Sequence, residues 1–276
     1  MAGPLTALVT GASRGLGAAI VRALLAHGWD VIAAVRTPEG YTSPDAARCI
    51  VTKLDLLDAD AIPGAVEEAL SIARGLGSGR IDAVVHNAGI TAYGAFEDTP
   101  VDVWSSMFQT NVFAPMLITR CLLPHLRAGG GHVVVVSSEA AMHGFPGVGT
   151  YAASKAAVSR WAESLAHEVG PLGVRVSILE PGAHATDITT DYPQHRNDRG
   201  PYVAMYPRLD ALTDLGRRIA RPPERFAERV VATLESAHPP LRRSAGPEAW
   251  AINLGTRLLP SRWLLAAIAA VTRPRR

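Results

Sequence analysis

The sequence of 276 residues is poor in cysteine and in clustered charge. Its two cysteines, Cys49 and Cys121, stand in neither a Cys-x-x-Cys nor a Cys/His spacing, which argues against a disulfide framework and a metal site and fits a reducing compartment. The net charge is only +2, and basic residues are spread along the chain except at its very end, so we expect no nucleic-acid partner. Internal repeats and Gly/Ser linkers are also absent. Together these absences favour chemistry on a small molecule.

Long apolar runs are absent as well. Residues 1–4 lead straight into a strand-like segment without the charged and apolar regions of a secretory signal, so we expect a cytoplasmic protein. The apolar stretch 263–271 is far shorter than the ~20 residues that cross a bilayer, so we expect no membrane span. Arginines surround that stretch, and three roles stay open for the tail at 247–276: weak peripheral contact with an anionic membrane, a cover over a substrate pocket, or packing on its own domain or a sister subunit.

What the chain does have is a regular alternation of apolar runs and helical patterns. The runs lie at 5–10, 29–35, 49–55, 81–86, 132–137 and 174–179, and the helical patterns at 15–27, 58–76, 101–127 and 151–169. Continuous β-branched residues such as 133–136 indicate strands that are covered on both faces. The sequence therefore predicts one α/β domain over 1–276, with a doubly wound parallel sheet, helices on both faces and a short final strand near 241–245.

The segment at about 183–223 interrupts this alternation. It is too aromatic for a spacer, since it holds Tyr192, Tyr202, Met205 and Tyr206. A long insertion near the end of a parallel strand is typical of a lid over an active site, so we predict a substrate lid here. A disordered surface loop is the alternative.

A glycine-rich turn follows the first predicted strand, in the order Thr10-Gly11-Ala12-Ser13-Arg14-Gly15-Leu16-Gly17. Its glycines stand where a backbone must turn sharply and come close to a pyrophosphate, and the helix that begins there offers unpaired N–H groups and a positive dipole end. By itself, the turn is equally typical of an ordinary strand-to-helix connection.

Three motifs occur together: the Thr-Gly-x-x-x-Gly-x-Gly turn, Asn87-Ala88-Gly89, and Tyr151-x-x-x-Lys155. In this combination the chain resembles the short-chain dehydrogenases/reductases, closely over about residues 5–190 and loosely beyond, and more weakly their hydroxysteroid and retinol dehydrogenase-like branches. His86 departs from the asparagine that is more usual there. The resemblance implies a Rossmann-like fold, a nicotinamide cofactor, and a homodimer or homotetramer formed through the helices that hold the tyrosine and an asparagine.

The resemblance also implies a cofactor site. In it Asp55 contacts the adenine, residues 87–89 hold the central strand against the cofactor, and Thr186 after Pro181-Gly182 grips the nicotinamide carboxamide. The full set of predicted cofactor-binding residues is Gly11, Ser13, Arg14, Gly15, Leu16, Gly17, Arg36, Asp55, Asn87, Ala88, Gly89, Tyr151, Lys155, Pro181, Gly182 and Thr186.

The cofactor preference follows from charge. An acidic residue at the end of the second strand would bind a free ribose and repel a 2′-phosphate, but this chain has Arg36 there. Together with Arg14 it would clamp a 2′-phosphate by charge-assisted hydrogen bonds. We therefore predict NADP(H) in preference to NAD(H). If both arginines are ordinary solvated charges, the protein would be an NADH-preferring dehydrogenase instead.

Tyr151 and Lys155 are four residues apart, so their side chains rise from one helix face, and a nearby ammonium favours the phenolate. The resemblance adds a lysine contact to the nicotinamide ribose, a substrate-steadying serine 13 positions before the tyrosine, which is Ser138, and Asn111 on a water-mediated proton path. Neighbouring strand residues face opposite ways, so Ser137 and Ser138 would not both face the cofactor.

We expect hydride transfer between the nicotinamide C4 and a carbonyl carbon, with Tyr151 as general acid or base and no metal. The pocket residues that we predict are Tyr93, Phe96, Met142, His143, Phe145 and Tyr192, a lining that favours a lipophilic ketone or secondary alcohol. Two other classes compete. A nucleotide-binding redox sensor would not need the Tyr-Lys pair, and an epimerase or dehydratase of the extended branch would carry a larger C-terminal domain.

Overall fold

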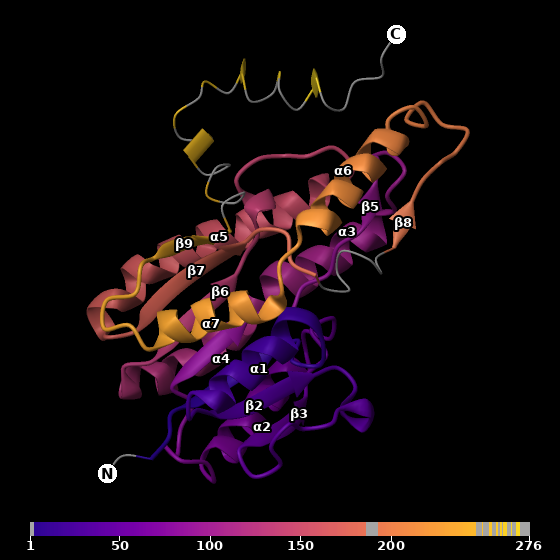
Figure 1. Cartoon of the computed structure of the whole chain (residues 1–276). Helices are drawn as coiled ribbons and strands as arrows, with labels where there is room; N and C mark the ends of the chain where they lie inside the picture. Colours follow the sequence, from indigo (N-terminus) through magenta and orange to yellow (C-terminus); the bar gives the residue numbers. More distant parts are fainter. Residues whose placement is uncertain are drawn as a thin grey trace.

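A computed structural model describes residues 3–185 and 193–246, together with isolated positions between 250 and 270 (Figure 1). Its centre is a seven-stranded sheet in the order β3-β2-β1-β4-β6-β7-β9, in which every neighbouring pair is parallel. The strands are β1 (Thr6–Thr10), β2 (Asp30–Val35), β3 (Cys49–Lys53), β4 (Ala83–His86), β6 (His132–Val136), β7 (Arg175–Pro181) and β9 (Arg242–Ala245). The order reverses between β1 and β4, and ligands bind at the carboxyl ends of strands at such a point.

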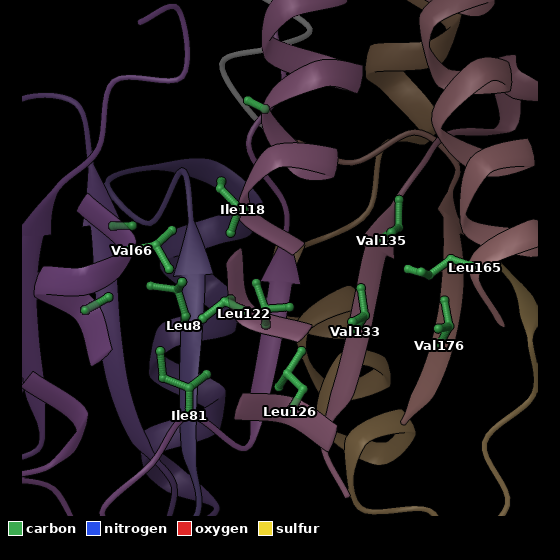
Figure 2. Packing of buried hydrophobic residues seen from close by; sticks show 14 of the residues in the cluster. Leu8, Val66, Ile81, Ile118, Leu122, Leu126, Val133, Val135, Leu165 and Val176 are labelled. Carbon is green, nitrogen blue, oxygen red and sulfur yellow. The ribbon is translucent and has the colours of Figure 1, made fainter. Parts of the chain in front are cut away.

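Helices cover both faces of this sheet, as the unbroken apolar strands predicted. They are α1 (Gly15–Ala26), α2 (Ile62–Ala73), α4 (Ala114–Gly129), α5 (Gly149–Val169) and α7 (Pro223–Leu234). Leu8 packs with α2, α4 and α5 on one face, whereas its neighbour Val9 packs with α1 and α7 on the other. Figure 2 shows part of the first layer, with side chains of β1, β6 and β7 among those of α4 and α5. The doubly wound α/β fold is thereby confirmed.

The prediction of a single long helix over 101–127 is wrong in one respect. The structure has α3 (Val101–Phe108), a π-helical turn (Gln109–Phe113) and then α4. Pro115 lies in the first turn of α4 and has no N–H to donate to the carbonyl of Asn111, so a regular hydrogen-bond ladder cannot pass this point. Turns of this kind are frequent at functional sites, and this one holds Asn111.

Much of the segment 183–223 is structured and is not the loop that we expected. It contains a helix, α6 (Tyr206–Ile219), and a short strand, β8 (Gln194–His195), which pairs with β5 (Tyr93–Gly94). Residues 186–192, including Thr186 and Tyr192, lie outside the described residues, as does most of the tail 247–276.

Helix α6 is held by a small core of its own, built from Tyr93, Ala95, Tyr206 and Leu209, which we call the satellite cluster. Hydrogen bonds run from the hydroxyl of Tyr202 to Glu97 (2.8 Å) and from that of Tyr206 to Asp98 (2.7 Å). Figure 1 shows α6, β5, β8 and α3 together at one end of the molecule.

Short 3₁₀ turns complete the elements, at Pro38–Gly40, Glu139–Ala141 and Gly170–Leu172. In the part of the chain that is described, no helix combines the length and apolar character that crossing a bilayer requires.

Candidate active site

The glycine turn between β1 and α1 is shaped by backbone conformation and by close packing. Gly11 (φ +65°) and Gly15 (φ +56°) adopt left-handed conformations that suit glycine. A Cβ on Gly17 would lie 2.0 Å from the carbonyl oxygen of Gly11 and 2.6 Å from Nδ2 of Asn87. Glycine at 17 is therefore required by the fold of the turn itself, before any ligand is considered.

Asn87 fastens the end of β4 to this turn. Its side-chain nitrogen donates hydrogen bonds to the carbonyl oxygens of Thr10 (3.0 Å) and Gly11 (3.3 Å). In return the hydroxyl oxygen of Thr10 accepts from the backbone N–H groups of Asn87 and Ala88, each at 3.1 Å. The motif at 87–89 thus holds the glycine turn in place across the switch point of the sheet.

A cleft of about 330 Å³ opens at the carboxyl ends of β1, β2, β3 and β4. It brings together most of the residues predicted to bind the cofactor, namely Gly11, Ser13, Arg14, Gly15, Leu16, Gly17, Arg36, Asp55, Asn87, Ala88 and Gly89. The shape and lining fit a dinucleotide, because a glycine cradle too tight for a Cβ lies at the N-terminus of α1, where phosphate binding is favourable.

Three charged residues line the cleft, namely Arg14, Arg36 and Asp55. Arg36 directly follows β2, is exposed, and has no hydrogen-bond partner among the described residues. Arg14 caps α1 in an extended conformation, and Asp55 accepts a hydrogen bond from the backbone N–H of Leu57 (3.0 Å). The two arginines therefore line the same cleft, as the sequence predicted, and an acidic side chain follows β3 rather than β2.

A second cavity, of about 450 Å³, continues from the cleft, and we call it the main cavity. Leu16, Asn87 and Gly89 line both spaces. Its wall includes Ser138, Tyr151 and Lys155, the last two from α5, and also Pro181 and Gly182 at the end of β7. The chain thus brings the three predicted catalytic side chains to a wall that adjoins the dinucleotide-shaped cleft.

Ser137 and Ser138 differ in their partners. The Ser137 hydroxyl bonds to the hydroxyl of Ser159 (2.6 Å) and to the carbonyl of Lys155 (3.3 Å), so it ties β6 to α5. The Ser138 hydroxyl accepts from the N–H of Ala140 (3.2 Å) and also interacts with the phenol of Tyr151. Ser138 is therefore the serine placed beside the tyrosine.

Electrostatics at the site are dominated by burial. Burial raises the pKa of Tyr151, the hydrogen bond with Ser138 lowers it, and the carboxylate of Glu139 raises it. Burial also lowers the pKa of Lys155 to about 8. We expected the ammonium to lower the phenol's pKa, but its nitrogen lies 6.0 Å from the centre of the Tyr151 ring and burial has the larger effect. The protein's own groups therefore keep the phenol protonated.

Asn111 is a fully bonded amide in the π-helical turn. Its Nδ2 donates to the carbonyl of Ile90 (2.9 Å) and to the hydroxyl of Ser154 (2.9 Å), while its Oδ1 accepts from the N–H of Ile90 (2.9 Å). A Cβ on Gly89 would lie 3.3 Å from Asn111 Oδ1 and 3.2 Å from Lys155 Nζ, so the three residues meet. Its predicted part in a proton path stays a prediction.

Only some of the predicted substrate-pocket residues line the main cavity. Tyr93 and Phe145 line the main cavity, but Met142 and His143 do not. After Ser138 the chain enters a 3₁₀ turn, and the His143 ring then packs edge-on against Phe145, with ring centres 4.2 Å apart. Phe96 also lies outside the main cavity, 71% exposed and stacked on Trp104.

The sequence predicted a substrate lid at 183–223 but not the helix within it. That helix, α6, lines the main cavity with Leu209, Leu212, Thr213, Gly216 and Arg217. These positions recur every three or four residues, a helical spacing that could have been found in the sequence. Glu139, which also lines the main cavity, was missed as well. His184 lines the cavity too, and its Nδ1 lies 2.9 Å from the carbonyl oxygen of Gly182. Among the described residues no group of three His, Cys, Asp or Glu side chains is placed to hold a metal ion.

Comparison with known proteins agrees with this geometry. Residues 5–197 match the family model described as short chain dehydrogenase. The chain is 33% identical over 247 residues to Oxidoreductase BOA17 of Botryotinia fuckeliana (87% of this chain, 88% of that protein), and 30% identical over 273 residues to NADPH-dependent 3-dehydrocapnine reductase of Ornithobacterium rhinotracheale (94% of each). A crystal structure of a short-chain dehydrogenase from Streptomyces avermitilis superposes with a TM-score of 0.81 at 33% identity, covering 99% of this chain and 98% of that one.

This chain therefore belongs to the short-chain dehydrogenase/reductase family. It is an oxidoreductase with a Rossmann-like fold that binds a nicotinamide cofactor and acts on CH–OH or C=O groups.

Proposed function

We propose that the protein is an NADP(H)-dependent ketoreductase or alcohol dehydrogenase that uses Tyr151 as its proton donor and acceptor. One observation carries the proposal. The wall that holds Ser138, Tyr151 and Lys155 belongs to a cavity that shares Leu16, Asn87 and Gly89 with the dinucleotide-shaped cleft. A carbonyl in that cavity lies within reach of both the phenol and a nicotinamide.

The glycine turn, residues 87–89 and Pro181-Gly182 would hold a nicotinamide cofactor, which when bound would supply a hydride to a carbonyl carbon or take one from an alcohol. Negative charge then develops on the substrate oxygen, and the hydroxyl of Ser138 stabilises it. Because burial keeps the Tyr151 phenol protonated, it is ready to donate its proton to that oxygen during reduction. In oxidation the phenolate form of Tyr151 accepts the proton of the alcohol, and the nearby Lys155 ammonium favours that form.

The preference for NADP(H) is supported by the arginines of the cleft. Arg14 and Arg36 both line it, and guanidinium groups bind phosphate oxygens by charge-assisted hydrogen bonds. The Ornithobacterium rhinotracheale relative is named as NADPH-dependent and as a reductase, which agrees with the proposal. The competing NADH preference would require that neither side chain contacts the bound cofactor.

Several wider features belong to the same proposal. The segment 183–223 serves as a substrate lid, an assignment supported by the five α6 residues in the cavity wall. The substrate is a lipophilic ketone or secondary alcohol, because apolar side chains dominate that wall. The protein works in the cytoplasm as a homodimer or homotetramer.

The decisive experiment follows NADPH consumption with a panel of ketones and compares Tyr151→Phe with the unmodified protein. We expect turnover to fall by about three orders of magnitude or more while the Kd for NADPH stays within a few-fold, because general acid catalysis is lost and the fold is not. Equal turnover in the variant would refute the mechanism. NADPH binding without turnover of any carbonyl, by either protein, would instead favour a redox sensor.

A further inference from the structure

A second pocket, of about 220 Å³, lies beside the main cavity. We call it the side pocket. Its lining comes from the segment 92–99 after β4, from α3, from the start of α5 and from the residues that precede α6. None of the residues predicted to bind cofactor lines it, so cofactor binding does not account for it.

The side pocket is suited to an apolar ligand. Its lining includes Ala95, Phe96, Met107 and Met205, and its polar side chains are uncharged. No charged residue contributes to it among the described residues. A pocket of that character favours hydrocarbon over any anionic or cationic group, because a buried charge without a partner is costly.

The two spaces adjoin along one segment of chain. Phe145, Pro146 and Val148 line both of them. The segment is pinned from the side-pocket end by the hydrogen bond from the N–H of Gly94 to the carbonyl of Gly147 (2.9 Å). Gly147 itself (φ +82°) leaves no room for a side chain, since a Cβ would lie 2.9 Å from Leu209 and 3.2 Å from Tyr93. A ligand longer than the main cavity therefore meets this shared wall and the side pocket beyond it.

We propose that the side pocket receives the far end of an unbranched apolar chain on a substrate whose carbonyl lies at Tyr151. The proposal rests on the function proposed above and adds a substrate class to it, namely ketones and secondary alcohols with an extended hydrocarbon chain. The lining residues that it shares with the main cavity argue for a substrate rather than a separate ligand. Each methylene group that is removed from water lowers the Kd about fourfold. Occupation of the side pocket can therefore be detected from the dependence of the Kd on chain length.

Gly149→Leu is the variant that closes the side pocket. Gly149 is the first residue of α5, lines the side pocket and not the main cavity, and a Cβ there meets no atom within 4 Å. Its φ is not positive, so leucine introduces no backbone strain. Gly144→Leu is the matched control, because its Cβ also meets nothing within 4 Å and it lines neither space.

The measurement is the Kd of 2-alkanones from 2-hexanone to 2-decanone, by calorimetry on protein saturated with NADP⁺, a mixture in which no turnover occurs. In the unmodified protein and in Gly144→Leu we expect Kd to fall about fourfold per added methylene. In Gly149→Leu the fall should stop at a shorter chain, which reduces the ratio of the Kd for 2-hexanone to that for 2-decanone by tenfold or more.

The same chain-length dependence in all three proteins would overturn the inference, and so would a Kd that does not respond to chain length in the unmodified protein. Failure of the proposed function looks different. It would leave this chain-length dependence and its loss in Gly149→Leu intact, while Tyr151→Phe turned over as fast as the unmodified protein.

Discussion

The side-chain nitrogen of Lys155 donates a hydrogen bond to the carbonyl oxygen of Val136, 2.9 Å away. This contact holds the amine at the carboxyl end of β6, inside the protein, where burial lowers its pKa to about 8. The lysine is therefore close to half protonated at mildly alkaline pH, and its charge is sensitive to conditions in which an exposed lysine stays cationic. Raising the pH through 8 removes the positive charge from the site.

We first expect the Lys155 amine to titrate near pH 8, because desolvation favours its neutral form. Reductive methylation with ¹³C-formaldehyde followed by NMR would measure this. The chain's other lysine, Lys53, is exposed and provides an internal reference, and Lys53→Arg assigns the signals. A Lys155 midpoint equal to that of Lys53 would contradict the expectation.

A second expectation concerns the pH dependence of alcohol oxidation. The carboxylate of Glu139 raises the pKa of Tyr151 and the Ser138 hydrogen bond lowers it. Oxidation needs the phenolate, so kcat/KM rises with pH through that pKa. Glu139→Gln should move the midpoint to lower pH and Ser138→Ala, besides slowing the reaction, should move it to higher pH. Glu67→Gln, on the exposed side of α2, serves as the control. Shifts in the same direction for both site variants would be incompatible with this account.

A third expectation concerns the choice of cofactor. Arg36→Asp removes a phosphate-binding group and adds a carboxylate that accepts hydrogen bonds from a free ribose. We expect the ratio of kcat/KM with NADPH to that with NADH to fall by about 10- to 100-fold, the effect of one charge-assisted hydrogen bond. Arg74→Asp, exposed at the end of α2 and outside the cleft, should leave the ratio unchanged. An unaltered ratio in Arg36→Asp would exclude the clamp.

A fourth expectation concerns the glycine turn. In Gly17→Ala the new methyl group would stand 2.0 Å from the carbonyl oxygen of Gly11, so backbone must move. We expect a loss of about 1–3 kcal/mol in the free energy of unfolding, with weaker NADPH binding. Gly64→Ala, in α2 with open space around its Cβ, should instead be neutral or stabilising by about 0.5–1 kcal/mol. Urea unfolding of both variants gives the comparison, and equal stabilities would count against the packing argument.

A fifth expectation concerns the stability of the protein at acidic pH. Burial lowers the pKa of His86 and of His132 to about 3, below the unfolded value near 6.5. The unfolded chain therefore binds more protons between these values, and stability falls as the pH drops from 6.5 toward 3. At pH 5 each histidine accounts for a loss of about 2 kcal/mol relative to pH 7.

The test compares the free energy of unfolding at pH 7 and pH 5 in the unmodified protein and in His86→Asn. The asparagine retains a polar group near the hydroxyl of Thr119, which lies 2.7 Å from the histidine Nε2. The variant should lose less stability between the two pH values. If its loss matches that of the unmodified protein, His86 is not the group that titrates.

The fold could be predicted from the sequence because the strands β1, β2, β4 and β6 are buried along their whole length and are mostly apolar. The glycine turn and the serine beside Tyr151 could be predicted too, because the family resemblance gives their positions relative to the other motifs. The π-helical turn was not predicted, because it depends on a single missing N–H group, that of Pro115. Helix α6 was missed because only Tyr206 and Leu209 of its residues are buried, against partners such as Tyr93 that are remote in sequence. Met142 and His143 do not line the main cavity, and they follow a 3₁₀ turn after Ser138 that the sequence did not predict.

Because of the satellite cluster, the substrate specificity of this protein can change separately from its fold. Tyr93, Tyr206 and Leu209 form a core that is separate from the two layers around the sheet, yet Tyr93 and Leu209 also face the main cavity. Exchanging the side chains of α6 can therefore reshape the reaction chamber without disturbing the scaffold that carries the nucleotide cleft. Substrate specificity depends on α6, whereas the fold depends on the two layers around the sheet. Substitutions in α6 can therefore change the specificity while the fold is kept.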